Sequence, residues 1–468
     1  MKILFAASEA RPFIASGGLA DVAGALPKAL CHMGDDCRVV IPLYADMKSE
    51  MAERLRFMGS FNVRLSWRNQ YCGLFTAVEG NVTYYFIDNE QYFKRRGLYG
   101  YYDDCERYAF FSMAVLEMCK HTGFWPDVIH ANDWQTALVP VYLRLFYQSD
   151  DRYRSIRTVF TIHNIGYQGQ FDMALLSDVF SIPWDLRGMV EYDGCINLLK
   201  GGIEASDRVN TVSPTYAKEI LDPYYGHGLD RFLVQRSGKL SGILNGIDLD
   251  VNNPETDPRI TKNFGPDTLS DKRVNTLALK TEFDLADNDQ PLIGIVTRLT
   301  QHKGIDLITR VFDDIMNLGF QVVVLGSGDY IYEEFFRDAA RRYPHRVGVW
   351  TGFVPELAAR IYAGADFFLM PSQYEPCGLA QMIALRYGTI PIVRKTGGLA
   401  DSIRDFGDGD GNGFTFWSYN AHDMLYAIER AHTAFYSPEF PAFRRRAMLS
   451  DFSWDRSAKE YQKLYEMK

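Results

Sequence analysis

The sequence predicts an α/β protein built from two domains of the Rossmann type. Short apolar runs alternate with turns rich in glycine or polar residues, and these turns lead into segments with helical spacing of apolar residues. The pentapeptide GGLAD occurs at residues 17–21 and again at 397–401, and both copies follow an apolar run and open a helical segment. The chain has 468 residues, more than one domain of roughly 100–200 residues, so two such domains are expected.

The first half of the chain contains apolar runs that predict parallel strands, each followed by a polar loop or a helix. The predicted strands are 2–7, 37–41, 127–130, 158–162 and 208–212. Helices are expected from the first GGLAD through Leu30, up to about Phe146, and over 197–205. Residues 60–90 have β-branched and aromatic residues separated by turn signals, which predicts a hairpin or strand insertion.

The boundary between the domains is predicted close to the Asn-Gly turn at 245–246, because the following residues are polar and lack periodicity. The second half then alternates strands and helices. Its predicted strands are 291–297, 320–325, 347–350, 366–370 and 389–393. The last segment, 453–468, is predicted as an amphipathic helix that packs back on the first domain. The predicted parts are therefore domain 1–244, domain 245–450 and the C-terminal helix 451–468.

Composition argues against several classes of protein. The formal net charge of −9 makes a nucleic acid or an anionic membrane a poor partner. The seven cysteines show neither a C-x-x-C pair nor Cys/His ligand spacing, so no metal site and no disulfide framework is expected. No apolar run approaches the roughly 20 residues that span a bilayer, and the N-terminus lacks a signal-peptide pattern. A soluble cytoplasmic protein with reduced thiols is therefore expected.

The densest binding chemistry lies between Phe368 and Asp401, where two strand-to-helix turns follow one another. Such turns lie at the carboxyl edge of a parallel sheet, where ligands bind. The first turn contains Glu375 and leads into a helix predicted to begin near Cys377–Gly378. In the second turn, adjacent glycines allow a close backbone approach that can direct N–H groups at an anion. The candidate binding residues here are Glu375, Cys377, Gly378, Leu379, Thr396, Gly397 and Gly398.

Other turns add candidates at equivalent strand ends. The first GGLAD copy contributes Gly17, Gly18 and Asp21. Asp133 and His163 follow two further predicted strands. A single Asp or His in a loop is more often a structural hydrogen-bonding group, but two such loops at equivalent strand ends favour a site.

Arg298 and Lys303 lie five residues apart in the turn RLTQHKG. Two cations beside a helix N-terminus can bind a diphosphate, and no DxD-type acidic pair stands in a matching loop to hold a metal. We therefore expect a metal-free diphosphate site. No G-x-G-x-x-G follows the first strand, which argues against a dehydrogenase.

The motifs EPCGL at 375–379 and RKTGGLAD at 394–401 resemble the C-terminal signature of bacterial and plant glycogen/starch synthases. These enzymes are retaining glycosyltransferases that build α-1,4-glucan from a nucleotide-glucose donor. The similarity extends from Ile3 to the C-terminal helix and includes the motifs HANDW, TIHNIGYQG, LNGID and RLTQHKG. It implies the GT-B fold, in which two facing Rossmann-like domains enclose a central cleft.

The resemblance also implies residue roles. It implies that Arg298 and Lys303 hold the donor phosphates, and that the donor-sugar pocket includes Asp133, His163, Asn245, Glu375 and the Cys377–Gly378 turn. The implied donor is ADP-glucose and the implied acceptor is an α-1,4-glucan such as glycogen or a maltooligosaccharide, with no cofactor. Retention of configuration follows from the family analogy alone. We assign Glu375 to the sugar hydroxyls.

The chain departs from the family pattern at one position. The N-terminal signature is commonly K-x-G-G-L-A-D, whereas this chain has Ala15 in place of the lysine. The loss could weaken donor binding, alter nucleotide preference or be compensated by Arg11. Two alternatives therefore stay open: a related glucosyltransferase that uses UDP-glucose or makes another linkage, and a non-catalytic glucan-binding scaffold. The aromatic segment 92–108 is either an acceptor-binding surface or a structured loop packed on the next helix.

Overall fold

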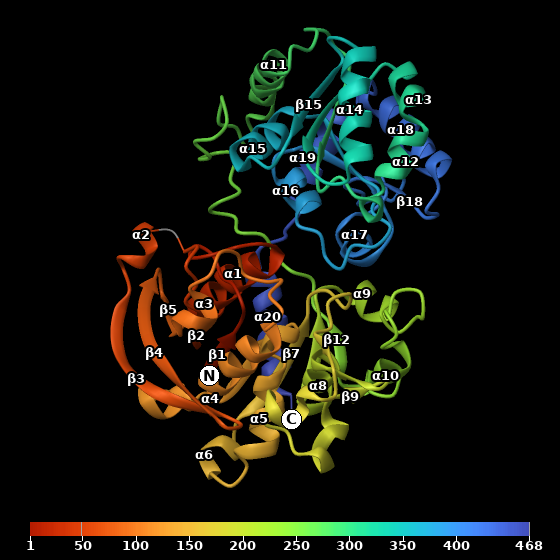
Figure 1. Cartoon of the computed structure of the whole chain (residues 1–468). Helices are drawn as coiled ribbons and strands as arrows, with labels where there is room; N and C mark the ends of the chain where they lie inside the picture. The colour runs from red at the N-terminus through yellow and green to blue at the C-terminus, as the bar shows by residue number, and fades with distance from the viewer. Residues whose placement is uncertain (48, 468) are drawn as a thin grey trace. The chain divides into compact units, whose positions relative to one another are not determined.

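A computed structural model describes residues 1–47 and 49–467, and the chain forms two compact units (Figure 1). Unit 1 contains residues 1–246 together with the C-terminal segment from Trp454 onward, and unit 2 contains residues 247–453. The predicted terminal helix includes Lys468, which lies outside the described residues.

Unit 1 is built on a nine-stranded sheet. The strands of this sheet are β1 (Lys2–Ala6), β2 (Asp36–Pro42), β3 (Arg56–Leu65), β4 (Arg68–Glu79), β5 (Val82–Asp88), β6 (Val128–Asn132), β7 (Arg157–Ile162), β11 (Arg208–Thr211) and β12 (Leu240–Gly242). Their order is β12-β11-β7-β6-β1-β2-β5-β4-β3. From β1 the chain adds β2 on one side and later β6 on the other, so a topological switch point lies between β1 and β6. A separate antiparallel sheet contains β8 (Gln170–Phe171), β9 (Glu191–Tyr192) and β10 (Cys195–Asn197).

The expected hairpin is present and widens the main sheet. Strands β3 and β4 pair antiparallel, and β4 pairs in the same way with β5. Strand β5 then pairs in parallel with β2, so the insertion continues the sheet of the Rossmann-like unit. Helices cover this sheet and form its turns, and they are α1 (Gly18–His32), α2 (Ser49–Ala52), α3 (Glu90–Phe93), α4 (Asp104–Thr122), α5 (Leu138–Phe146), α6 (Asp151–Arg154), α7 (Leu175–Asp178), α8 (Leu198–Ala205), α9 (Pro214–Glu219) and α10 (Asp230–Val234).

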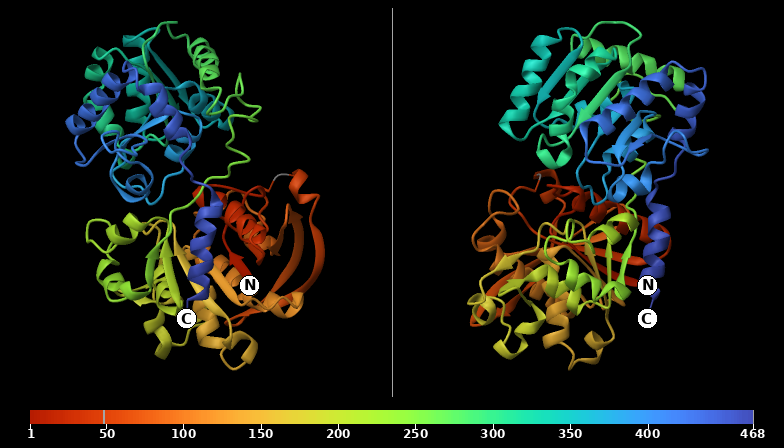
Figure 2. Two further views of the ribbon diagram at one scale, coloured as in Figure 1. Left: turned by 180° about the vertical axis from the view of Figure 1, so that it is seen from behind. Right: turned by 90° about the vertical axis from the view of Figure 1, so that its right-hand side faces the viewer.

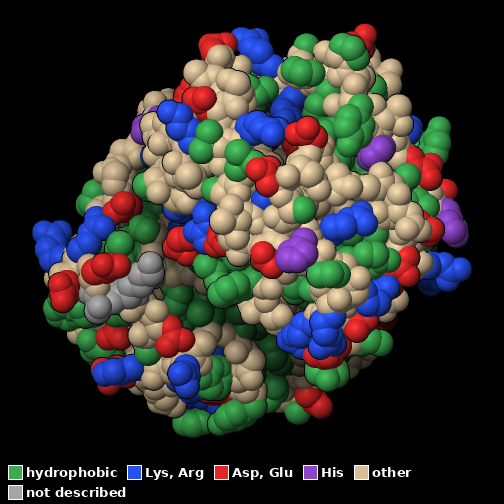
Figure 3. Space-filling view, turned by 90° about the horizontal axis from the view of Figure 1, so that it is seen from above, with side chains coloured by type: hydrophobic (Ala, Val, Ile, Leu, Met, Phe, Trp, Pro, Cys, Tyr) green, Lys and Arg blue, Asp and Glu red, His purple; other side chains and the backbone are tan. Residues whose placement is uncertain are grey.

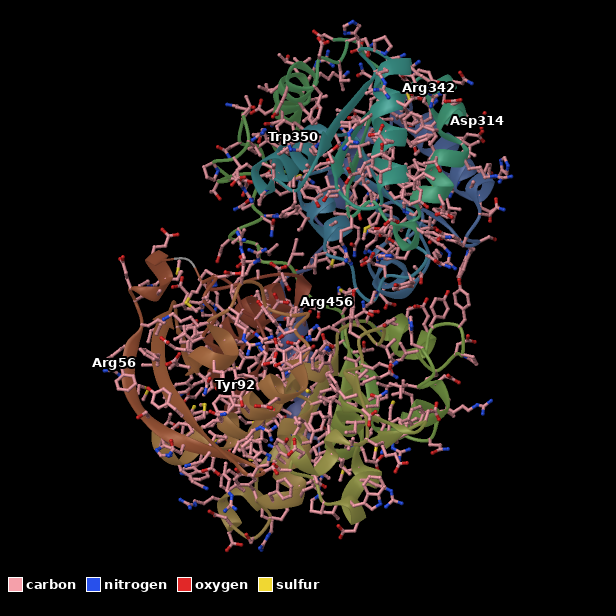
Figure 4. All side chains as sticks on the ribbon, viewed as in Figure 1. Arg56, Tyr92, Asp314, Arg342, Trp350 and Arg456 are labelled. Carbon is pink, nitrogen blue, oxygen red and sulfur yellow. The ribbon has the colours of Figure 1, made fainter. Side chains whose placement is uncertain are left out.

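The aromatic segment 92–108 is mostly part of the interior of unit 1. Tyr92, Phe93 and Tyr108 are fully buried, and Figure 4 shows Tyr92 among the interior side chains of this unit. Arg107 is also buried, and its guanidinium donates to the carbonyls of Tyr92 and Leu98. The structure therefore favours a loop packed on the following helix over an exposed sugar-binding surface. Tyr102 is the one aromatic residue described in this segment that is exposed, with 95% of its surface accessible.

Unit 2 contains a six-stranded parallel sheet. Its strands are β13 (Leu292–Val296), β14 (Gln321–Gly326), β15 (Val347–Thr351), β16 (Phe367–Met370), β17 (Ile390–Arg394) and β18 (Phe414–Phe416). The order β15-β14-β13-β16-β17-β18 is the 3-2-1-4-5-6 order of a Rossmann fold. The topological switch point therefore lies between β13 and β16, which are neighbours in the sheet.

The helices of unit 2 alternate with its strands as predicted. They are α11 (Lys272–Glu282), α12 (Ile305–Arg310), α13 (Phe312–Asn317), α14 (Tyr330–Arg342), α15 (Pro355–Gly364), α16 (Ala380–Arg386), α17 (Gly397–Ser402), α18 (Ala421–Phe435) and α19 (Phe440–Met448). The sequence did not predict β18, because three residues behind a glycine- and aspartate-rich loop are too few for a periodic signal.

The C-terminal helix α20 (Trp454–Glu466) packs on unit 1. It lies beside α1, as both views in Figure 2 show. Its apolar face buries Trp454, Tyr461 and Tyr465, which is the expected outcome for an amphipathic helix. The Ser457 hydroxyl donates to the Leu244 carbonyl at 2.6 Å and ties the start of α20 to the chain just before unit 2 begins.

A buried polar network joins α20 to three strands of the sheet. The Tyr465 hydroxyl lies 2.8 Å from Nδ1 of His130 on β6, and His130 Nε2 lies 2.6 Å from Oγ1 of Thr161 on β7. Thr161 donates to Asn210 Oδ1 on β11, and the Asn210 amide donates to the Tyr461 hydroxyl. Since Thr161 uses its hydrogen on Asn210, His130 is protonated on Nε2 and its Nδ1 accepts from Tyr465.

Lysines and arginines are interspersed with aspartates and glutamates on the face shown in Figure 3. None of the helices in the described residues has the length and apolarity needed to cross a membrane. All seven cysteines are free thiols.

We predict that Tyr465→Phe lowers the free energy of unfolding of unit 1 by about 1–3 kcal/mol, because it leaves the buried Nδ1 of His130 without a hydrogen-bond donor. Urea unfolding measures the effect. Tyr102→Phe is the matched control, since that hydroxyl is on an exposed side chain and should leave the unfolding midpoint unchanged. Equal midpoints for both variants would contradict the network.

Candidate functional site

In unit 2, the turns that follow β13 and β16 meet at the topological switch point. The Gln373 N–H donates to the His302 carbonyl at 2.9 Å and joins the two turns. Gly304 has φ +77°, and a Cβ at this position would lie 2.2 Å from the Pro371 carbonyl oxygen. Only glycine fits this conformation and this spacing, so the last residue of RLTQHKG allows the turns to approach each other.

This approach brings Lys303 to Glu375 across 72 residues of sequence. Lys303 Nζ donates to Glu375 Oε2 at 2.6 Å, and the Ser372 hydroxyl donates to the same oxygen at 3.1 Å. The two side chains are only 15% and 10% exposed, so water screens the pair weakly. The predicted phosphate ligand Lys303 and the predicted sugar ligand Glu375 are therefore an ion pair in this structure.

Arg298, on the same turn as Lys303, is exposed. Within the described part of the chain, no hydrogen bond or ion pair engages its guanidinium. Arg298 can therefore offer its charge and its planar N–H groups to an anion without first breaking a contact. This turn therefore contains two cations: Lys303, which is paired with Glu375, and Arg298, which has no partner among the described residues.

The second Gly-Gly turn packs against the backbone of the EPCGL segment. A Cβ on Gly397 would lie 1.9 Å from the Glu375 carbonyl oxygen, and one on Gly398 would lie 2.1 Å from that of Cys377. The Gly398 N–H donates to the carbonyls of Glu375 and Pro376, both at 3.1 Å. These glycines are therefore explained by the contact between two loops, and Thr396 beside them is fully buried.

Helix α16 begins at Ala380, later than the predicted start near Cys377–Gly378. Gly378 has φ +71°, a left-handed conformation that interrupts a helix. Cys377 is buried, and Leu379 is half-buried in the turn before the helix. The predicted helix start was therefore wrong by two to three residues.

In unit 1, the turns after β6 and β7 are joined by Asp133. Its carboxylate accepts a hydrogen bond from the His163 N–H at 2.7 Å. The residue has φ +57°, which directs the chain sharply away from the end of β6. Burial raises the pKa of Asp133 to about 7, so the protonated and charged forms coexist near neutral pH.

The His163 imidazole lies against Asn132, the last residue of β6. Nε2 of His163 is 2.9 Å from Oδ1 of Asn132. Burial lowers the pKa of His163 to about 3, so the ring is neutral at physiological pH. Sequence reasoning missed Asn132, although a polar residue at the end of an apolar strand is the available signal.

The first Gly-Gly turn differs from the second. The Glu9 carboxylate accepts hydrogen bonds from the backbone N–H groups of Ser16 and Gly17, and burial raises its pKa. Among the described residues beyond its own helix and chain neighbours, no atom lies within 4 Å of where a Cβ on Gly18 would be, so packing does not require glycine there. Space for a ligand is therefore left at this turn, beside a carboxylate that the sequence analysis did not consider.

Arg11, the residue that could compensate for the lysine missing at position 15, is engaged in an ion pair in this structure. Arg11 Nε donates to Asp21 Oδ1 at 2.6 Å, so the predicted binding residue Asp21 neutralises it. Ala15 itself is exposed. Arg11 therefore has its charge partly neutralised by Asp21, although both side chains of the pair stay accessible to water.

Asn245 and Phe353 are two further candidates for ligand binding. Asn245 is buried, and its Oδ1 has no hydrogen-bond partner among the described residues. Phe353 follows β15 at the carboxyl edge of the unit 2 sheet and is 72% exposed, a candidate that the sequence analysis missed. In the described residues, no group of three His, Cys, Asp or Glu side chains could hold a metal ion.

We predict that Gly304→Ala lowers the free energy of unfolding of unit 2 by about 3 kcal/mol, because the new Cβ adds a backbone clash to a left-handed conformation. Gly319→Ala is the control: φ is +97° there, but the nearest atom to a Cβ is 3.8 Å away. We expect a loss of about 1 kcal/mol for that variant. Chemical unfolding of both variants measures the difference, and equal losses would show that the contact with Pro371 is unimportant.

Family models match both halves of the chain. Residues 2–235 match the model described as starch synthase catalytic domain, and residues 280–433 match glycosyl transferases group 1. Glycogen synthases are similar over the full length. That of Geobacillus thermodenitrificans (strain NG80-2) is 50% identical, covering 100% of this chain and 97% of the relative. That of Bacillus cereus (strain ATCC 10987 / NRS 248) is 48% identical, with 100% and 99% covered.

Solved structures agree with this relationship. The catalytic domain of starch synthase IV from Arabidopsis thaliana, bound to ADP and acarbose, has a TM-score of 0.90 at 35% identity, covering 99% of this chain and 98% of that chain. Sucrose-phosphate synthase from Thermosynechococcus elongatus, at a TM-score of 0.62, 17% identity and the same coverage, shares the fold. The predicted fold class is therefore confirmed. The chain belongs to the glycogen/starch synthase family, and it is a hexosyltransferase with the GT-B fold.

Proposed function

We propose that the protein transfers glucose from ADP-glucose to the non-reducing end of an α-1,4-glucan with retention of configuration. The observation that carries this proposal is the Lys303–Glu375 pair beside the available Arg298, at the switch point of a Rossmann-like sheet. The similarity to glycogen synthases and to a starch synthase bound to ADP and acarbose supports these substrates.

The cations of unit 2 suit a departing diphosphate. Negative charge grows on the leaving phosphate as the glycosidic bond breaks, and preorganised donors lower the energy of that state. Arg298 can bind phosphate oxygens in a bidentate manner, and Lys303 adds a second charge from the same turn. Phe353, exposed at the carboxyl edge of the same sheet, is proposed to stack on the nucleotide base.

The polar groups suit a sugar. We propose that Glu375, already oriented by Lys303 and Ser372, accepts hydrogen bonds from glucose hydroxyls. Within unit 1, we propose His163, Asp133 and Asn245 as candidate ligands of sugar hydroxyls. No carboxylate is assigned as a nucleophile, so we favour attack on the same face of the sugar, assisted by the leaving phosphate.

The proposed reaction uses no cofactor and no metal, and the only partners it needs are the donor and the glucan. We propose that it takes place in the cytoplasm, where reducing conditions would keep the seven cysteines as free thiols.

Transfer of labelled glucose to glycogen from ADP-glucose and from UDP-glucose, assayed in parallel, tests the function. Faster transfer from ADP-glucose is expected. A preference for UDP-glucose would favour the related glucosyltransferase. Binding of glycogen without transfer from either donor would favour the non-catalytic scaffold.

We predict that Arg298→Ala and Lys303→Ala each reduce kcat/KM for the donor by about 100-fold or more, because each removes a charge-assisted contact to the leaving diphosphate. Arg310→Ala is the matched control, since this exposed arginine ends the helix after the same turn. It should retain normal turnover. Near-normal kcat/KM in either site variant would remove that residue from the phosphate site.

We also predict full transfer activity after exhaustive treatment with EDTA, because the proposed phosphate ligands are side chains and not a bound metal. The assay compares untreated enzyme, treated enzyme and treated enzyme with added Mg²⁺. Activity that disappears with EDTA and returns with Mg²⁺ would contradict the prediction.

A further inference from the structure

We propose that Asn132 is a positioning residue that holds His163 as its Nε2–H tautomer, so that the His163 Nδ1 lone pair accepts a hydrogen bond from a hydroxyl of the sugar substrate. This inference deepens the proposed function and rests on it for the identity of the ligand. The position of Asn132 itself is a property of unit 1 alone.

The orientation of the Asn132 amide follows from its other contacts. Asn132 is fully buried, and its Nδ2 donates to the Ala6 carbonyl at 3.0 Å and to the His130 carbonyl at 3.3 Å. The flipped amide would place its oxygen against two carbonyl oxygens, from which it could accept no hydrogen bond. The amide oxygen must therefore be the atom that lies 2.9 Å from His163 Nε2.

The tautomer of His163 follows from this orientation. Oδ1 of Asn132 has no hydrogen to give, so Nε2 of His163 must carry the hydrogen and donate it. The ring is neutral, because burial holds its pKa at about 3. Its titratable neighbours are His130, which is fully buried, and Asp133, which is half-buried. His130 is also neutral, with a pKa lowered to about 3. His163 Nδ1 is therefore an unprotonated acceptor.

Nδ1 is available to a ligand. No hydrogen bond from the described residues engages it, and His163 is half-buried at the turn that follows β7. The main-chain N–H of the same residue is held by Asp133, so neither the backbone nor the ring is free to turn. The side chain is thus fixed by one contact at its backbone and one at its ring.

The chemistry of an acceptor selects the group it binds. A sugar hydroxyl can donate to an imine-type nitrogen, whereas an ionised phosphate oxygen has no hydrogen and would repel the lone pair. His163 is therefore assigned to the sugar of the donor and not to its diphosphate. Loss of Asn132 should affect the binding and transfer of the sugar much more than the binding of ADP.

The first measurement is the tautomer itself. Enzyme labelled with ¹⁵N-histidine contains nine histidines, and His163→Gln identifies the signal of interest by its loss. Long-range ¹⁵N–¹H spectra distinguish protonated from unprotonated ring nitrogens. We expect an unprotonated Nδ1 and a protonated Nε2 at neutral pH in the wild type. A protonated Nδ1, in either the neutral or the charged ring, would overturn the proposal. The tautomer itself is read from the wild-type enzyme, and the variant serves only to assign the signal.

The second measurement compares Asn132→Ala with Asn210→Ala. Asn210 is an equally buried asparagine on β11, and its side chain contacts Thr161 and Tyr461 but not His163. Asn132→Ala should mix the two tautomers and lower kcat/KM for ADP-glucose by about tenfold, while the Kd for ADP changes by less than about twofold. Asn210→Ala should leave the His163 tautomer and kcat/KM within about twofold of wild type.

An unchanged tautomer in Asn132→Ala would overturn the proposal, and so would equal losses of kcat/KM in the two variants. Failure of the proposed function is distinguishable from these results. It would appear as a wild-type enzyme that transfers no glucose, while the spectra still decide whether Asn132 fixes the ring.

Discussion

The close approach of two turns at the end of the unit 2 sheet is the constraint on which the candidate site depends. Gly304 can lie against the Pro371 carbonyl only because it has no Cβ. That contact places Lys303 within 2.6 Å of Glu375 and leaves Arg298 on the same turn without a partner among the described residues. A charged pair with little exposure would be costly if either member were lost, since the remaining charge would stay buried and unpaired.

The two GGLAD copies show that one pentapeptide can meet two different constraints. In the second copy, the backbone of Glu375 and Cys377 occupies the positions where side chains would begin, so glycine is required by packing. In the first copy, Gly18 has open space around it, and the N–H groups of the turn already bind the Glu9 carboxylate. The identical pentapeptides therefore predicted that both copies form a turn before a helix. They did not predict the contacts of each turn, because those contacts come from distant segments.

Local sequence signals predicted most strands of the two large sheets, several helices and the turns that carry the candidate residues, because periodicity and glycine placement are local properties. They could not predict the Lys303–Glu375 pair, which spans 72 residues, or the pairing of Arg11 with Asp21. The start of α16 was misplaced because Gly378 adopts a left-handed conformation, which the spacing of apolar residues does not reveal. Asn132 was missed because its significance lies in the amide orientation that two carbonyls impose.

The candidate turns of the two units differ in charge, and this difference indicates which chemical groups each of them suits. The candidate turns of unit 2 contain Arg298 and Lys303, whereas those of unit 1 contain a neutral His163, an Asp133 with a pKa near 7, and an Arg11 already paired with Asp21. Neutral acceptors and partly protonated carboxyl groups bind hydroxyls well and attract phosphate little. We therefore infer that the candidate turns of unit 2 suit phosphate groups, and that those of unit 1 suit hydroxyl groups.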